Sequence, residues 1–332
     1  MKIFITGTAG FIGFHLARRL LAAGHRVTGY DGITDYYDPA LKRARLALLG
    51  DLPGFTRIDG MLEDAALLGG TIARFEPDIV FHLAAQAGVR YSIENPGSYV
   101  SSNLTGTYNV LEAVRATKPR HLLLASTSSV YGGNPKTPFA ETDRTDFPIS
   151  LYAATKRATE AMSHSYAHLF GIPTTAVRFF TVYGPWGRPD MALFKFAEAM
   201  RAGRPIDVYG DGSATRDFTF VNDLVEALQR LMEVAPQPGA PAGGFDSLSP
   251  VAAWRAVNVG SGHPVALNVF IAAIEKAFGA PAMRNVMPMQ PGDVKDTSAD
   301  PRLLQALIGF APTTPVEHGV ARFVEWFRGY GG

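Results

Sequence analysis

The sequence contains no cysteine. That absence excludes disulfide bonds, thiol nucleophiles and metal sites built from thiolates. The eight histidines are scattered apart from His164 and His168, which stand four residues apart, and no cluster of carboxylates accompanies them. We therefore interpret the histidines as structural or surface residues and expect no metal site.

An excess of one charge and a long apolar run are missing too. The formal net charge is only +1, with no basic or acidic block, so a nucleic-acid partner has no electrostatic support. No apolar run reaches the length of a membrane span, and the first residues have the pattern of a strand rather than of a signal peptide. We therefore expect a cytoplasmic protein with no membrane partner.

A Gly-rich turn stands between a strand pattern and a helix pattern at the N-terminus. Residues 2–6 form a short apolar run typical of a buried parallel strand, and residues 11–23 have the pattern of a helix. Gly7, Gly10 and Gly13 lie at this junction. Glycines there let the backbone approach a pyrophosphate, and a helix N-terminus offers free N–H groups and a positive dipole. The junction predicts a dinucleotide-binding site.

The next strand pattern, at residues 26–30, is followed by Asp31. A carboxylate in this position accepts hydrogen bonds from the adenosine ribose hydroxyls and repels a 2′-phosphate. The sequence therefore favours NAD over NADP as the cofactor.

A hydroxyl-rich segment and a tyrosine–lysine pair indicate the chemistry. Thr127 and Ser128 follow a predicted strand at residues 121–125, at the edge where ligands bind in doubly wound sheets. Tyr152 and Lys156 lie four residues apart in a helical pattern, so they share one face. A free tyrosine has a pKa of about 10, which a nearby ammonium and a nicotinamide cation lower. The pair predicts a tyrosine that acts as a base toward an alcohol, with Thr127 or Ser128 bonded to the same substrate oxygen.

Strand and helix patterns alternate along the first half of the chain, as expected of an α/β fold with a parallel sheet. We predict strands at residues 2–6, 26–30, 55–59, 78–82, 121–125 and 174–179. We predict helices at residues 11–23, 39–49, 64–75, 98–116, 151–170, 193–202, 267–278 and 316–328. The predicted fold is a Rossmann-type doubly wound parallel sheet with a smaller C-terminal α/β lobe that binds the substrate.

The length of the chain exceeds a single typical core, so we expect two domains. The first is an NAD-binding domain over residues 1–180, to which some later segments return. The second is a substrate-binding lobe over residues 181–332. Residues 235–254 are rich in proline, glycine and alanine, which predicts a flexible surface insertion.

Further segments extend these motifs along nearly the whole chain. They are the Ser126–Gly132 cluster and the stretches at residues 81–92, 103–107, 178–191, 216–218 and 291–294. With them, the sequence resembles the UDP-glucuronate 4-epimerases of the extended short-chain dehydrogenase/reductases, the NAD-dependent epimerase/dehydratase family. The resemblance implies that UDP-glucuronate and UDP-galacturonate interconvert through a transient 4-keto intermediate, with bound NAD taking up and returning a hydride.

The resemblance also implies roles for individual residues. Tyr152 would be the base for the C4 hydroxyl, Lys156 would support it and bind the nicotinamide ribose, and Thr127 and Ser128 would lie around the reacting oxygen. The further substrate contacts would come from Arg90, from Thr181 and Arg188 at the sugar carboxylate, from Arg216 at the diphosphate and from Asp293 near the nucleotide. The cofactor contacts would come from Gly7, Gly10, Phe11, Ile12, Gly13, Asp31, Met61, Leu62, Leu83, Ala84, Ala85, Asn103, Ser126, Tyr152, Lys156 and Phe179.

Two positions depart from the pattern of these epimerases. Such proteins often have an aspartate in the loop after the third strand and an asparagine directly after the acidic residue of the second. Here the two positions are Met61 and Gly32. Either Asp59 or packing would therefore hold the adenine ring.

Other activities of the same family are alternatives. The nearest is a nucleotide-sugar 4-epimerase for UDP-glucose and UDP-galactose. Dehydratases and decarboxylases usually have an acid just before Val-Tyr-Gly, where this chain has Ser128 and Ser129, so an elimination would lack its general acid. A non-catalytic NAD-binding module would typically lose the tyrosine or the lysine that this chain keeps.

The resemblance further implies a homodimer that pairs the helices at residues 98–116 and 151–170 of each subunit. The apolar residues expected on their outer faces are Val110, Val114, Ala158, Ala161 and Met162. The same residues are equally consistent with contacts inside one chain.

Overall fold

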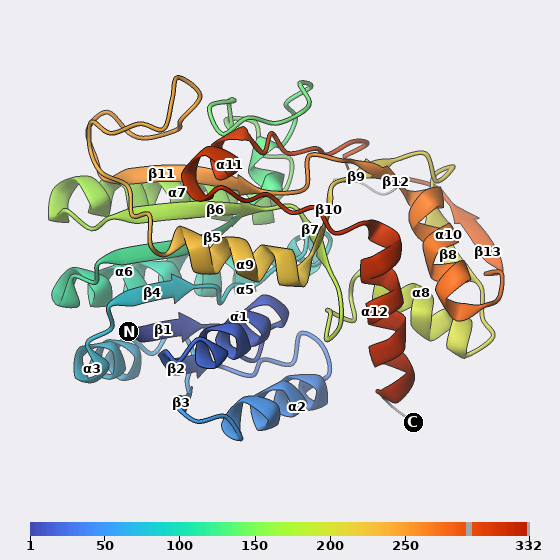
Figure 1. Cartoon of the computed structure of the whole chain (residues 1–332), viewed down its shortest axis with the longest axis horizontal. Helices are drawn as coiled ribbons and strands as arrows, with labels where there is room; N and C mark the ends of the chain where they lie inside the picture. Colours follow the sequence, from blue (N-terminus) through green and yellow to red (C-terminus); the bar gives the residue numbers. More distant parts are fainter. Residues whose placement is uncertain (290–293, 331–332) are drawn as a thin grey trace.

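The computed structural model describes residues 1–289 and 294–330. A seven-stranded parallel sheet forms its centre (Figure 1). The strand order across the sheet is β11-β6-β5-β4-β1-β2-β3. The strands are β1 (Lys2–Thr6), β2 (Arg26–Asp31), β3 (Phe55–Asp59), β4 (Ile79–His82), β5 (His121–Thr127), β6 (Thr174–Phe179) and β11 (Trp254–Val259).

Burial explains the composition of the central strands. Every residue of β4, β5, β6 and β11 is buried, because helices cover both faces of the sheet. Such strands need apolar side chains on both faces rather than an alternating pattern. The strand order reverses between β1 and β4, so the loops that leave these two strands open a crevice where ligands bind in such sheets.

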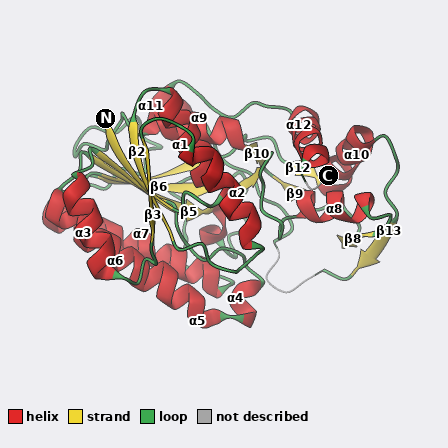
Figure 2. Ribbon diagram, turned by 90° about the horizontal axis from the view of Figure 1, so that it is seen from below, coloured by secondary structure: helices red, strands yellow, loops and turns green. Residues whose placement is uncertain are grey.

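Helices cover the sheet in two layers (Figure 2). One layer contains α1 (Phe11–Ala22), α2 (Pro39–Gly50), α9 (Val221–Leu231) and α11 (Arg302–Ile308). The other layer contains α3 (Ala65–Phe75), α6 (Gly106–Thr117) and α7 (Leu151–Phe170). Two short helices and a π-helical turn lead into α6; they are α4 (Tyr91–Glu94), α5 (Pro96–Tyr99) and η1 (Val100–Thr105), and a 3₁₀ turn, η2 (Ser128–Tyr131), follows β5.

Local signals fix the ends of α7, the helix that carries the tyrosine–lysine pair. The Ser150 hydroxyl accepts a hydrogen bond from the backbone N–H of Ala153 at 3.1 Å and so caps the first turn. Gly171 ends the helix in the left-handed conformation, at φ +67°. The predicted bounds of this helix are confirmed.

A smaller lobe stands beside the sheet, at the right of Figure 1. Its core is built from aromatic rings, such as Phe218 and Phe270, which stack with centroids 4.0 Å apart. Its elements are β7 (Thr181–Tyr183), α8 (Ala192–Arg201), β8 (Ile206–Tyr209), β9 (Thr215–Arg216), β10 (Phe218–Phe220), β12 (Val265–Ala266), α10 (Leu267–Phe278), β13 (Arg284–Met287) and α12 (Val316–Gly329).

The predicted fold class is confirmed, and later segments return to the large sheet as expected. They are β11, which pairs with β6, and α9 and α11, which pack on α1 and on each other. Residues 216–218 span the end of β9 and the start of β10, strands too short to produce a periodic pattern in the sequence. The two domain boundaries stay a prediction.

The segment at residues 235–254 is fastened to α7 near its end. His164 bonds the Ser249 hydroxyl at 2.8 Å, and the His168 ring bonds the Val251 carbonyl at 2.7 Å. A buried ion pair joins Asp246 to Arg255 on β11 at 3.1 Å. In the part of the chain that is described, no helix is both long and apolar enough to cross a membrane.

The expected dimer residues do not form one outer face. Val110 and Val114 are fully buried in the core between α3 and α6, so they cannot contact a partner, and this part of the expectation is wrong. Ala161 is exposed, while Ala158 and Met162 are half-buried. Helix periodicity alone does not tell which of two apolar stripes faces the chain's own sheet.

Candidate active site

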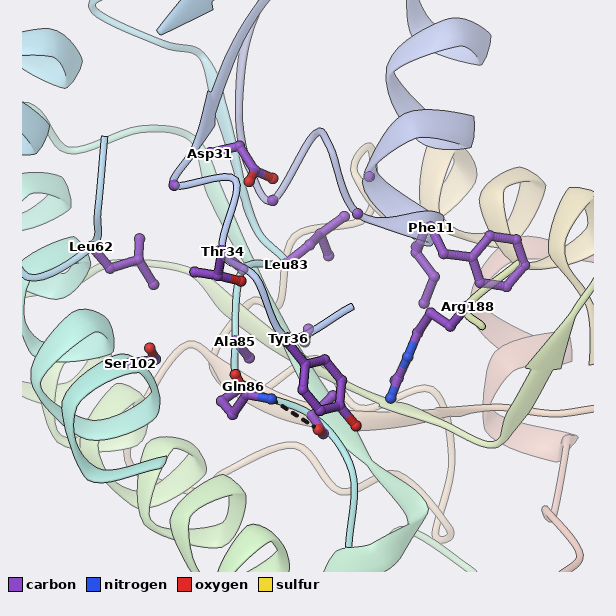
Figure 3. A pocket seen from close by; sticks show the side chains of 18 of the residues that line it. Phe11, Asp31, Thr34, Tyr36, Leu62, Leu83, Ala85, Gln86, Ser102 and Arg188 are labelled. Carbon is purple, nitrogen blue, oxygen red and sulfur yellow. Dashed lines mark hydrogen bonds between the residues drawn. The ribbon is translucent and has the colours of Figure 1, made fainter. Parts of the chain in front are cut away.

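One large cavity runs along the carboxyl ends of the central strands (Figure 3). Its wall combines the Gly-rich turn with the loops after β2, β3, β4 and β5, one face of α7, and residues after β6. The predicted site residues on this wall are Gly7, Gly10, Phe11, Ile12, Gly13, Asp31, Met61, Leu62, Leu83, Ala84, Ala85, Ser126, Thr127, Tyr152, Lys156, Phe179 and Arg188. Two distant parts of the sequence therefore meet in one site.

The glycines of the turn are required by close backbone contacts. Gly7 has φ +82°, and a Cβ atom there would lie 2.8 Å from the Ala84 nitrogen. A Cβ atom at Gly13 would lie 2.1 Å from the Gly7 carbonyl oxygen. The N-terminus of α1 begins at Gly10 without a side-chain cap, so its first N–H groups remain available to an anion.

Asp31 lies at the end of β2 with its carboxylate beside the turn. It accepts hydrogen bonds from the backbone N–H groups of Ala9 and Ile33, each at 2.8 Å. Burial raises the pKa of Asp31, while these two N–H groups and the charges of Lys42 and Arg45 oppose the rise. The carboxylate is thus held in place at the cavity wall, where the sequence predicts a ribose.

The two departures from the family pattern pack against each other. A Cβ atom at Gly32 would lie 2.3 Å from the Met61 sulfur. The backbone of Met61 is fixed by the Tyr30 hydroxyl, which donates to its carbonyl at 2.9 Å. The Met61 side chain is 41% exposed on the cavity wall, whereas Asp59 pairs with Arg57 on the surface. Packing against Met61, rather than a contact to Asp59, therefore suits this end of the cavity.

Asn103 does not line the cavity itself but holds Gln86, which does. Its amide accepts from the Gln86 N–H at 2.8 Å and donates to the Gln86 carbonyl at 3.0 Å and to the Thr155 hydroxyl at 3.1 Å. It does not line the cavity, so a direct cofactor contact is not what its position offers. The neighbouring Ser102 does line it, because the π-helical turn rotates this part of the helix.

Tyr152 stands on the wall at the level of Thr127. Burial raises the pKa of Tyr152, while a hydrogen bond with Thr127 and the charge of Arg188 lower it. The Thr127 hydroxyl also accepts from the Ser129 N–H at 3.2 Å, so its position is fixed. The ammonium of Lys156 contacts a backbone carbonyl rather than the tyrosine hydroxyl.

The Lys156 ammonium donates to the Ala125 carbonyl at 2.9 Å. Burial lowers its pKa to about 8, and the Glu160 carboxylate opposes this. Glu160 itself is paired with Arg178 through two contacts of 2.9 Å and accepts from the Ser126 hydroxyl at 2.6 Å. The buried Glu160–Arg178 ion pair thus fixes the Ser126 hydroxyl, and the Glu160 carboxylate stabilises the positive charge of Lys156. The sequence analysis did not identify Glu160 or Arg178 as a pair, because nothing in their spacing links them.

Arg188 is already paired. Its Nε and Nη2 bind the two Asp190 oxygens at 3.0 and 2.5 Å, and the Tyr36 hydroxyl donates to the same carboxylate at 3.0 Å. The side chains of Arg188 and Tyr36 lie close together in Figure 3. No described residue accepts a hydrogen bond from Nη1. A neutral sugar would therefore not leave Arg188 without a partner.

The other described substrate residues that the sequence predicts do not line the large cavity. Thr181 lines a smaller cavity that adjoins the large one and also contacts Arg188. Ser128 is half-buried in η2, off the cavity wall. The Arg90 guanidinium lies 4.5 Å from the Tyr209 ring of the smaller lobe, and Arg216 donates to the Lys295 carbonyl at 2.8 Å. Asp293 is outside the described residues.

Several cavity residues were missed by the sequence analysis. They are mainly on the loop after β2, whose pattern carries no motif, and they include Thr34, Tyr36, Tyr37 and Lys42. The Lys42 ammonium donates to the Thr34 carbonyl at 2.6 Å and so holds this loop closed.

The residues present fit a dinucleotide. The turn leaves no space for side chains where a pyrophosphate approaches, the first N–H groups of α1 suit its charge, and Asp31 suits a ribose with a free 2′-hydroxyl. Fold and site together define a dinucleotide-dependent protein with a tyrosine–lysine pair next to the cofactor.

Comparison with known proteins agrees with this class. Residues 3–241 match the model of the NAD dependent epimerase/dehydratase family. A probable UDP-glucuronate 4-epimerase of Rhizobium meliloti (strain 1021) is 57% identical over 98% of this chain and 97% of its own. UDP-glucuronate 4-epimerase 3 of Arabidopsis thaliana is 42% identical over 99% of this chain and 77% of its own. The chain therefore belongs to the NAD dependent epimerase/dehydratase family, and its cofactor is NAD.

A solved structure resembles the whole chain. It is the UDP-glucuronic acid 4-epimerase from Bacillus cereus in complex with UDP-glucuronic acid and NAD, with a TM-score of 0.88, 31% identity and 99% of both chains covered. The likeness extends over the smaller lobe as well as the sheet.

Proposed function

We propose that this protein is an NAD-dependent UDP-glucuronate 4-epimerase that interconverts UDP-glucuronate and UDP-galacturonate. The observation that carries the proposal is the position of Tyr152 and Lys156 on the wall of the same cavity as the Gly-rich turn. The full-length similarity to epimerases that are named for this substrate supports it.

The chain's own residues account for the proton transfers. NAD, when bound, supplies a reversible hydride acceptor beside the sugar. Tyr152 removes the proton of the C4 hydroxyl as the C4–H bond breaks, and it returns the proton after the 4-keto sugar has turned in the site. Thr127 holds the same oxygen in line through its fixed hydroxyl. Lys156, held at the Ala125 carbonyl, places a positive charge beneath the cofactor end of the cavity.

The sugar carboxylate is assigned to Thr181 and Arg188. Both line the smaller cavity that adjoins the large one, and Arg188 belongs to both walls. Because Asp190 holds two of its nitrogens, Arg188 offers Nη1 alone. Arg90 and Arg216 are assigned to the diphosphate side of the substrate, with Asp293, and Ser128 to the rim near the sugar.

The arrangement of acids disfavours an elimination reaction. The carboxylates on the cavity wall, Asp31 and Glu63, lie at the end of β2 and in the loop after β3, where they accept hydrogen bonds from Ala9, Ile33 and Ser102. Glu160, the carboxylate behind Lys156, is consumed by Arg178 and Ser126. No described acid of the cavity therefore stands where a dehydratase needs one. A neutral-sugar 4-epimerase is the remaining alternative, and a cytoplasmic homodimer stays a prediction.

The test is product analysis. Purified protein is incubated with UDP-glucuronate, with and without added NAD, and the nucleotide sugars are separated and identified. Formation of UDP-galacturonate, and recovery of UDP-glucuronate from UDP-galacturonate, is the expected result. Turnover of UDP-glucose in place of UDP-glucuronate would support the alternative, and release of carbon dioxide would indicate a decarboxylase.

A further inference from the structure

A fully buried arginine joins the cofactor side of the site to the loop that carries Arg188. Arg45, on α2, has no exposed surface. Its Nη1 donates to the Ala9 carbonyl in the Gly-rich turn at 2.8 Å. Its Nη2 donates to the carbonyls of Trp186 and Gly187, at 2.6 and 3.1 Å. Nη1 also donates to the Tyr37 hydroxyl, in the loop after β2, at 2.7 Å. One planar group thus contacts this loop and two others that are about 175 residues apart in the sequence.

The backbone of the second loop is shaped to make this contact. Trp186 has φ +60°, a left-handed conformation that a residue with a bulky side chain rarely adopts. It turns two successive carbonyls toward the same guanidinium. The Trp186 ring is fixed between Phe14 on α1, at 5.5 Å, and Trp326 on α12, at 5.2 Å. Arg188 follows directly, so the contacts of Arg45 fix the point from which Arg188 reaches the cavity.

Stability alone does not explain why a charged residue stands at position 45. Among the described residues no carboxylate forms an ion pair with it, and its Nε has no hydrogen-bond partner. Burying a cation with neutral partners alone is costly, and an apolar side chain would fill the same space without that cost. The cation does, however, sit behind the turn that receives a diphosphate, where a positive charge is favourable.

We propose that Arg45 is a positioning residue that sets the loop of residues 184–190 against the Gly-rich turn, so that binding of NAD and binding of the sugar depend on each other. The proposal goes beyond the proposed function but rests on it for the identity of the sugar. Arg45 does not touch the reactants. It acts on NAD through Ala9 and on the sugar through Arg188.

The test uses three variants of the full chain. Arg45→Met keeps an unbranched side chain and removes the charge and the hydrogen-bond donors, and Arg45→Lys keeps the charge but cannot reach all the acceptors with one nitrogen. Arg43→Met, on the exposed side of the same helix, is the matched control. Thermal unfolding checks that each variant folds, and if Arg45→Met does not, Arg45→Lys is used alone.

Affinity is the first measurement. The Kd of NAD is expected to rise roughly tenfold in Arg45→Met, less in Arg45→Lys and not in Arg43→Met, as expected for loss of a charge-assisted contact. The nucleotides are titrated in a Tyr152→Phe background, which prevents turnover. There, Arg45→Met should raise the Kd of UDP-glucuronate and leave the Kd of UDP, which lacks the sugar, unchanged. Equal weakening of UDP and UDP-glucuronate would show a general structural defect and overturn the proposal, as would an unchanged Kd for NAD.

A double-mutant cycle is the second measurement. If Arg45 acts on the sugar through Arg188, Arg45→Met should change the affinity for the sugar little once Arg188→Ala is present. Additive losses would overturn this route. Failure of the proposed function is seen separately, as absence of turnover of UDP-glucuronate by the wild-type protein. In that case the nucleotide sugar that the protein does turn over replaces UDP-glucuronate in the titrations, and the NAD measurement is unaffected.

Discussion

The base of the reaction is a single hydroxyl group. We predict that Tyr152→Phe abolishes turnover and leaves NAD binding near normal, because the change removes the proton acceptor and little volume. Steady-state rates and an NAD titration measure the two effects. A variant that keeps more than about a tenth of the wild-type rate would show that Tyr152 is not the base, since a proton-transfer residue contributes far more than this.

Selectivity between sugars also rests on one side chain. We predict that Arg188→Ala lowers kcat/KM for UDP-glucuronate by about ten- to a hundredfold, and for UDP-glucose by clearly less, as expected for loss of a charge-assisted contact. The substitution also leaves Asp190 without its main partner, and the unpaired Asp190 carboxylate repels the carboxylate of the sugar. Arg188→Ala combined with Asp190→Asn separates the two effects. Equal losses for both sugars would contradict the assignment of the carboxylate to Arg188.

Glu141 makes stability depend on pH. It is buried and accepts a hydrogen bond from the Asn258 N–H at 2.8 Å. Burial raises its pKa from 4.5 to about 7, although this N–H opposes the rise. Between these two values the folded protein holds a proton that the unfolded chain has released. The free energy of unfolding therefore falls as pH rises through this range, by roughly 3 kcal/mol from this group.

Urea unfolding at a series of pH values tests this assignment. Glu141→Gln keeps an acceptor for the Asn258 N–H and cannot ionise, so its stability should vary less between pH 5 and pH 7 than that of the wild type. The exposed Glu325→Gln is the control and should follow the wild type. Parallel curves for the wild type and Glu141→Gln would show that Glu141 ionises normally.

At the level of single residues, the sequence identified those that carry recognisable chemistry. Gly7, Asp31, Tyr152 and Lys156 were found because a turn, a strand end or a helix face places them predictably. Arg45 and Glu160 were not, because their partners come from distant segments and no pattern of spacing records a buried hydrogen bond. Arg188 was found, but its pairing with Asp190 depends on a side-chain conformation that sequence does not contain.

At the scale of elements, long periodic segments were predicted well and short or irregular ones were not. The predicted helix at residues 151–170 and the strand at 174–179 are confirmed to the residue. The predicted helix at residues 98–116 is instead α5, η1 and α6 in succession. A π-helical turn inserts one residue into the helical repeat, which a 3.6-residue periodicity cannot reveal.

That π-helical turn leads to a prediction of its own. Asn103 lies in it and makes three buried hydrogen bonds that hold the loop after β4 to α7. We predict that Asn103→Ala weakens NAD binding and lowers the free energy of unfolding by about 1–3 kcal/mol, because buried backbone groups of Gln86 lose their partners. NAD titration and urea unfolding measure the two effects. Asn285→Ala, at an exposed position on β13, should change neither, and normal NAD binding in Asn103→Ala would contradict a positioning role.

At the scale of the whole molecule, the two parts of the fold do not share a single apolar core. The sheet with its helices and the smaller lobe have separate apolar clusters, and Trp186 packs against both. The cavity lies along this junction. The length of the chain and the alternation of strand and helix patterns predicted a large sheet and a smaller lobe, but they contain no information on how the loops between them close.

Assembly is the remaining property at this scale. With Val110 and Val114 inside the core, a dimer that uses α6 and α7 must bury other residues. The exposed large apolar side chains on these helices include Val100 on η1, Tyr108 on α6, and Leu151 and Leu169 on α7. Figure 2 shows α3, α6 and α7 together on one side of the sheet. Large apolar side chains gathered on an open face suit a protein–protein contact.

We predict that the protein is a dimer through this face and that Tyr108→Glu weakens it, because each copy would then bury an unpaired carboxylate in a two-fold interface. Light scattering at micromolar concentration should give twice the mass of one chain for the wild type and a concentration-dependent lower mass for the variant. Leu48→Glu, at a similarly exposed position on α2 in the opposite layer, is the control and should stay dimeric. A monomeric mass for the wild type would refute the dimer, and equal dissociation by both variants would place the interface elsewhere.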